Sequence, residues 1–162
     1  MKRKLFLTFI VLMLVFITGC DKNKTTVSSS KKSFSITCTG DSEKMDKMET
    51  QNETTYNFNN EQYVISYSVT TTQKFTDKSL YNEYKTAQEQ TVSDSSDDVS
   101  YELKSDDKAL SLVFTMTINN IDINNAETEE EKDSLKAKSI LESLESSDYK
   151  CTLNDITKAD LK

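Results

Sequence analysis

The clearest chemical signal in this sequence is a cysteine that ends an apolar segment near the N-terminus. Residues 2–4 are basic, residues 5–17 carry no charge, and the segment closes with Ile17-Thr18-Gly19-Cys20. The apolar segment is too short to span a bilayer, which takes about 20 residues, but it fits a secretory signal. The four closing residues match the bacterial lipobox, in which the cysteine thiol accepts a diacylglyceryl group and the chain is cut just before it. We therefore expect a type II (lipoprotein) signal peptide over residues 1–19 and lipidation of Cys20; a signal anchor with an incidental cysteine is the alternative.

This signal predicts where the rest of the chain lies. Two acyl chains on Cys20 would anchor the protein stably in a membrane, where one chain would bind only marginally. Residues 20–32 are polar, show no periodicity and are typical of a flexible tether. We expect residues 33–162 to form one extracytoplasmic domain, held by its lipid anchor at the outer face of the cell membrane.

The two other cysteines, Cys38 and Cys151, form an even pair in a domain that is expected to be exported. Disulfides persist outside the cytoplasm, so we expect one disulfide between these residues. It would close a loop of more than 100 residues, which is worth about 4–5 kcal/mol in the chain-entropy treatment. Two free buried thiols are the alternative.

The composition excludes several kinds of function. The first 19 residues hold three of the 20 basic residues and none of the 27 acidic ones, so residues 20–162 carry a net charge of −10. Such an acidic domain argues against nucleic acid as a partner. The chain has no histidine, and Gly40 is the one glycine after the signal peptide. Histidine-based catalysis, imidazole-bound zinc and glycine-rich phosphate loops are therefore excluded.

Other catalytic groups show no motif. A Ser-Lys dyad needs a buried lysine beside a serine, and no serine near Lys74, Lys104 or Lys150 has a recognisable sequence around it. With 27 acidic residues, pairs of carboxylates arise by chance, so the acidic runs at 94–98 and 127–131 are expected to be solvated surface. The sequence predicts that the protein is not an enzyme and needs no cofactor.

Residues 120–131, NIDINNAETEEE, are the sharpest metal-binding candidate. Their Asn, Asp, Thr and Glu side chains fall at the oxygen-ligand positions of an EF-hand loop, and a helix is expected to follow. However, Asn120 stands where the loop normally has Asp, Asn125 stands where it has Gly, and a strand leads in instead of a helix. An ordinary strand-to-helix connection capped by Thr128 explains the pattern as well, and we assign no metal site.

The seven tyrosines are the remaining candidate. Rings and hydroxyls on a sheet can bind glycans or peptides, but in a small domain they more often form half-wet parts of the core. The tyrosines are Tyr56, Tyr63, Tyr67, Tyr81, Tyr84, Tyr101 and Tyr149.

Alternation of apolar and polar residues predicts the strands. Residues 33–39 form a first strand, residues 54–58 and 63–75 form a hairpin, residues 99–118 form a second hairpin, and residues 149–153 form a last strand. Helical spacing is seen over 76–90, where Thr76 or Asp77 is placed to cap the start, and from Thr128 to Leu144. Residues 41–53 give no clear signal. The order β-β-β-α-β-β-α-β predicts an α+β domain with an antiparallel sheet of five to six strands and two helices packed on one face. Threonines and serines at alternate strand positions predict a polar opposite face.

Taken together, the lipobox ITGC, the small size and the segment TTYNFNNEQYVISYSVTTT followed by a Tyr-bearing helix resemble the YehR-like small bacterial lipoproteins. The resemblance covers about residues 1–120 and implies a strand-hairpin-helix-hairpin plan without an established biochemical activity. This chain departs from it in having Cys38 and Cys151, and in lacking glycines around the second hairpin. No site residue is carried over.

The sequence thus predicts a membrane-anchored extracytoplasmic lipoprotein that binds a ligand or a protein. The alternative is a structural or assembly factor of the cell envelope that acts through a protein partner. The membrane, through Cys20, and an envelope protein or a small ligand are the expected partners.

Overall fold

The structure, a computed structural model, describes residues 33–162. The predicted signal peptide, Cys20 and the tether lie outside these residues. The strands and helices are, in chain order, β1 (Phe34–Thr39), β2 (Glu43–Met45), β3 (Met48–Phe58), β4 (Val64–Phe75), α2 (Lys78–Val92), β5 (Val99–Asp106), β6 (Ser111–Ile118), α3 (Glu129–Ser134), α4 (Ala137–Ser146) and β7 (Lys150–Asn154). Short 3-10 turns lie at Ile123–Asn125 and Lys158–Asp160.

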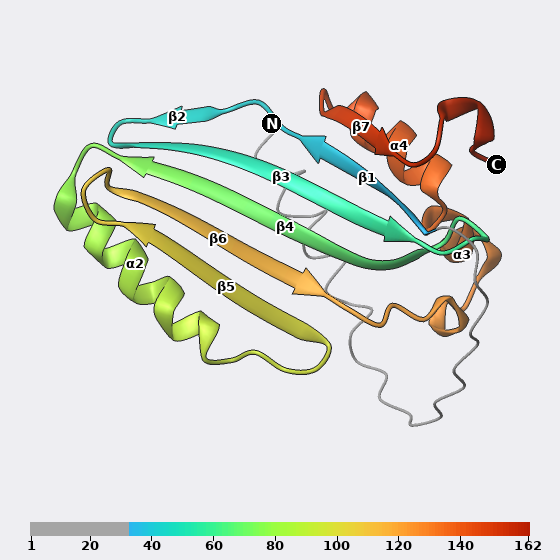
Figure 1. Cartoon of the computed structure of the whole chain (residues 1–162), viewed down its shortest axis with the longest axis horizontal. Helices are drawn as coiled ribbons and strands as arrows, with labels where there is room; N and C mark the ends of the chain where they lie inside the picture. Colours follow the sequence, from blue (N-terminus) through green and yellow to red (C-terminus); the bar gives the residue numbers. More distant parts are fainter. Residues whose placement is uncertain (1–32) are drawn as a thin grey trace.

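The strands form one antiparallel sheet, which confirms the predicted α+β class. Six strands run in the order β5-β6-β4-β3-β1-β7, and β2 pairs with β3 beyond the end of β1 (Figure 1). The sheet therefore has seven strands, one more than the upper number expected. The first and last strands of the described part lie side by side, because β7 pairs with β1.

Both long helices pack on the same face of this sheet, as predicted. In β3, Met48 and Tyr56 are an even number of residues apart, so their side chains share a face. Tyr56 belongs to the buried cluster under α4, which includes Ile140, and Met48 belongs to a second cluster under α2, which includes Tyr81. Figure 1 shows the two helices toward opposite ends of the sheet. We call this the helix-bearing face and the other the open face.

The start of β3 was missed in the sequence because its pattern is polar. Strand β3 begins at Met48 and not at residue 54, and β2 lies in the stretch that gave no signal. Met48 is 7% exposed and pairs with Phe75, but the next inward positions are Thr50 and Asn52. Polar residues at inward positions hide the alternation on which strand prediction depends.

The predicted helix from residue 128 to 144 is in fact two helices, and the single-helix interpretation was wrong. Between α3 and α4, Lys136 is extended (φ −77°, ψ 145°) and pairs with Tyr63. The Val64 amide donates to the Leu135 carbonyl (3.0 Å) and the Ala137 amide donates to the Gln62 carbonyl (2.9 Å). These long-range hydrogen bonds replace the helical ones and fix α4 against the β3–β4 loop. They explain why Leu135 falls off the apolar stripe of α4.

Candidate functional site

The cysteine pair is joined in the structure. Cys38 and Cys151 lie directly opposite each other on β1 and β7 and form a disulfide with an S–S distance of 2.02 Å and a sequence separation of 113. This is the pairing expected from the sequence. Cys38 has no exposed surface and belongs to the core cluster under α4. Because both sulfur atoms are in the disulfide, neither cysteine offers a free thiol as a nucleophile.

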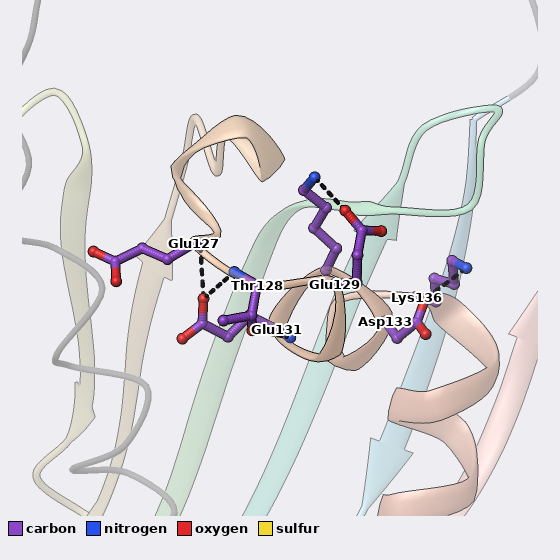
Figure 2. A network of polar contacts seen from close by, with 7 residues as sticks. Glu127, Thr128, Glu129, Glu131, Asp133 and Lys136 are labelled. Carbon is purple, nitrogen blue, oxygen red and sulfur yellow. Dashed lines mark hydrogen bonds and ion pairs between the residues drawn. The ribbon is translucent and has the colours of Figure 1, made fainter.

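The side chains of the EF-hand-like segment form hydrogen bonds that cap α3 and the 3-10 turn before it. In Figure 2 the Glu131 carboxylate faces the backbone just before α3, where it accepts hydrogen bonds from the amides of Glu127 (2.7 Å) and Thr128 (3.1 Å). The Thr128 hydroxyl accepts the Glu131 amide in return (3.1 Å), which completes the predicted capping box. Upstream, Asp122 caps the 3-10 turn through the amide of Asn124 (2.9 Å). Within residues 33–162 no group of three or more acidic or cysteine side chains is arranged to hold a metal ion.

The rest of the network in Figure 2 consists of two ion pairs, one within α3 and one between α3 and the residue that precedes α4, each with an exposed carboxylate and a half-buried lysine. Lys132 pairs with Glu129 (2.8 Å) and Lys136 with Asp133 (2.7 Å), each three residues apart. A pair within a helix, such as Lys132 with Glu129, stabilises it by only about 0.2–0.5 kcal/mol. This acidic segment is therefore a structural connection, and it is not a candidate site.

One buried tyrosine lies beside an aspartate and a lysine, a combination that is also found in catalytic sites. Tyr81 of α2 donates its hydroxyl to Asp107, which also accepts from the Lys85 ammonium (2.8 Å). Burial and the hydrogen bond to Asp107 raise the pKa of Tyr81. The hydrogen bond from Lys85 lowers the pKa of Asp107, and the same bond raises the pKa of Lys85. Each shift strengthens the group's usual protonation state at neutral pH, so none can exchange a proton readily. The cluster fastens α2 to the β5–β6 turn.

The three lysines near strands do not form dyads with serine. Lys104 and Lys150 are exposed and pair with Glu102 (3.1 Å) and Asp41 (3.4 Å). Lys74 is exposed and lines a hollow on the open face with Ser42, Glu49, Gln51 and Thr72. Ser42 donates its hydroxyl to Glu49 (2.6 Å), and this bond lowers the pKa of the Glu49 carboxyl. A serine that donates to a carboxylate beside an exposed lysine lacks the buried base that a Ser-Lys dyad needs.

The tyrosines gather on the helix-bearing face and not on the open face. Tyr56 and Tyr67 are neighbours across β3 and β4, with ring centroids 5.6 Å apart, and burial raises the pKa of both hydroxyls. Tyr81 and Tyr84 lie on α2, and Tyr149 packs against the cluster under α4. The main role of these five tyrosines is in the core. Tyr63 and Tyr101 belong to neither cluster, and the Lys136 ammonium lies 5.7 Å from the centre of the Tyr63 ring.

Tyr101 belongs to a set of apolar side chains between the two core clusters. Val69, Met116 and Tyr101 lie side by side on β4, β6 and β5, directly opposite one another in the sheet. Phe114 is the next inward residue along β6, and its ring stacks on Tyr101 with centroids 5.8 Å apart. We call these four residues the apolar strip. All are half-buried, and neither core cluster includes them.

The strip is bordered by polar side chains on the same face. Thr71 of β4 donates its hydroxyl to the Asn52 side chain of β3 (2.8 Å), and Thr54 lies next along β3. Apolar side chains beside a few fixed polar groups are the usual composition of a binding surface. The sequence shows the alternation of these residues, but it could not show that the register would bring them together outside both core clusters.

Comparisons with known proteins support the fold and leave the function open. No protein-family model and no curated protein matches the chain. The fold is similar to the NMR structure of a protein from Streptococcus pneumoniae TIGR4, with a TM-score of 0.52 and 12% identity over 83% of this chain and 99% of that one. In the part that the structure describes, no helix has the length and apolar character needed to cross a membrane. At this identity the likeness concerns the architecture alone.

Proposed function

We propose that this protein is an extracytoplasmic binding module, held at the membrane by lipidated Cys20, that binds its partner through the apolar strip. The strip is the observation that carries the proposal. A half-buried row of aromatic and aliphatic side chains that belongs to neither core contributes less to folding than a buried row does. Tyr, Phe and Met are enriched at binding interfaces, and stacked rings such as Tyr101 and Phe114 are effective anchors.

Two further features support the extracytoplasmic location. The ITGC box precedes the domain by a polar segment of tether length, and the Cys38–Cys151 disulfide is of a kind that persists in oxidising compartments. The absence of histidine, together with pKa shifts that strengthen the usual charge states in residues 33–162, favours binding over catalysis.

The second candidate is a structural or assembly factor of the cell envelope that uses the same strip against a protein partner. It is favoured by the composition of the strip, because apolar and aromatic residues are as suited to a protein surface as to a small ligand. The two candidates differ in what is bound, and one cross-linking experiment separates them.

The anchoring is tested by blocking the lipoprotein signal peptidase with globomycin. We expect the unprocessed precursor of the full chain to accumulate in treated cells, because cleavage before Cys20 depends on that enzyme. A Cys20→Ser variant should also stay uncut without the inhibitor, but its precursor should lack the diacylglyceryl group. Processing is measured by gel mobility or mass spectrometry. If the chain is processed normally under globomycin, the lipoprotein interpretation is wrong.

The binding surface is tested by placing a photo-crosslinking amino acid at position 114 or 115 of the full chain in cells. These neighbours on β6 point to opposite faces of the sheet, so position 115 is the matched control. We expect a discrete protein adduct at position 114 if the partner is a protein, and a small mass increase if it is a small molecule. Equal amounts of the same protein adduct at both positions, or protein adducts at 115 alone, would contradict the proposal.

A further inference from the structure

The open face of the sheet carries an unbroken row of hydroxyl groups across all six strands of the main path. The register places each residue directly opposite the next: Thr152, Thr37, Thr55, Ser68, Thr117 and Ser100. Adjacent strands are about 4.8 Å apart, so the row extends over roughly 24 Å. We call these six residues the hydroxyl row.

Over β7, β1, β3 and β4 the face beside this row carries no charge on one side, whereas at the β5 end Asp98 lies two residues before Ser100 and is exposed. The adjoining positions toward the start of β1 are Asn154, Ser35, Asn57 and Ser66, which are again hydroxyls and amides. In the whole chain 29% of residues are charged, yet these two rows contain none. Charges begin on the other side of the hydroxyl row, at Lys150, Glu53 and Glu102.

The hydroxyl row is accessible and ordered. Neither helix packs on this face, and the six residues are half-buried or exposed. Cross-strand hydrogen bonds hold the side chains in place, as between the hydroxyls of Thr37 and Thr55 (3.0 Å) and from the Asn57 amide to Ser66 (3.0 Å). Each hydroxyl has one donor and two acceptor sites, so a hydroxyl engaged once can still bind a ligand.

We propose that the hydroxyl row binds a neutral polysaccharide strand laid across the sheet. A pyranose chain presents hydroxyls at intervals close to the spacing of the strands, so successive rings can meet successive side chains. The uncharged positions of β7, β1, β3 and β4 fit a neutral chain, and the net negative charge of the domain disfavours a polyanion because it repels it. This site lies on the face opposite the apolar strip, and it does not depend on the function proposed for that strip.

The test uses the mature chain, residues 20–162, with Cys20→Ser so that no lipid is attached. Cellohexaose and the N-acetylglucosamine hexamer are titrated into the 15N-labelled protein, and a hexamer of galacturonate serves as the charged probe. We expect saturable amide shifts on β1, β3, β4 and β6 with a neutral hexamer, and binding of the charged hexamer weaker by tenfold or more.

A pair of variants assigns the binding to the hydroxyls. Thr55→Val with Thr117→Val removes two central hydroxyls and keeps the β-branched shape, and it should weaken binding by about tenfold or more. Thr50→Val is the control on the same strand: its side chain points to the helix-bearing face, and its hydroxyl has no hydrogen-bond partner among residues 33–162. Binding by this variant should be unchanged. Absence of saturable shifts with both neutral hexamers, equal affinity in the double variant, or shifts confined to the apolar strip would overturn the proposal.

Discussion

Reduction of the Cys38–Cys151 disulfide is expected to lower the free energy of unfolding by about 4–5 kcal/mol. The bond joins residues 113 positions apart, and cross-linking so long a loop removes much of the conformational entropy of the unfolded chain. It also fastens β7, an edge strand of five residues, to β1 in the centre of the core under α4. For a domain of this size the loss corresponds to a fall in Tm on the order of 15 °C.

Urea unfolding of the mature chain, followed by circular dichroism with and without dithiothreitol, measures this effect. The Cys38→Ala/Cys151→Ala variant is the control, because its stability should match that of the reduced protein and should not respond to dithiothreitol. A difference below about 1 kcal/mol between oxidised and reduced protein would contradict the prediction. It would mean that β1 and β7 stay paired even in the unfolded chain.

The sequence predicts the order of most strands and helices, because the signals for these elements are local. Alternation identifies β1, β4, β5, β6 and β7, and Asp77 caps α2 through the amide of Leu80 (2.9 Å), as one of two expected caps. The capping box at Thr128 is likewise local and was confirmed. Each of these depends on residues within four positions of one another, and such contacts can be seen in a single sequence.

What could not be predicted depends on contacts between distant segments. The break between α3 and α4 exists because Lys136 pairs with Tyr63, 73 positions earlier. The hydroxyl row and the apolar strip exist because the register aligns residues from up to six strands, and neither β2 nor the polar start of β3 has a local signal. The lipid anchor on Cys20 and the resemblance to YehR-like lipoproteins stay predictions from the sequence.

The two faces of the sheet also differ in how their polar groups are held. On the helix-bearing face, Gln73 is 6% exposed and accepts a hydrogen bond from Gln88 of α2 (2.7 Å), so polarity there secures a helix. On the open face, polar side chains bind one another across strands, as Thr70 and Thr115 do (3.1 Å). Polar side chains that form hydrogen bonds with one another can face water, so this face needs no covering element. The helices therefore form a layer on the other face of the sheet.

Phe58→Ala is expected to lower the free energy of unfolding by about 3–5 kcal/mol, the usual range for a phenylalanine in a core. Phe58 has no exposed surface, and its ring stacks on Phe34 with centroids 5.0 Å apart. It lies in the cluster under α4, so the cavity would also loosen that helix. Phe58→Leu should cost clearly less, since it keeps most of the volume.

Phe114→Ala is the matched comparison, because it removes the same ring from the apolar strip. Its side chain is half-buried and belongs to neither cluster, so we expect a cost of roughly 1–2 kcal/mol, in proportion to the smaller apolar area withdrawn from water. Urea unfolding of both variants under the same conditions gives the two values. If Phe114→Ala costs as much as Phe58→Ala, the strip is part of the core and its residues cannot also serve as a binding surface. A clearly smaller cost leaves the Phe114 ring available to a partner, since the fold then does not depend on it.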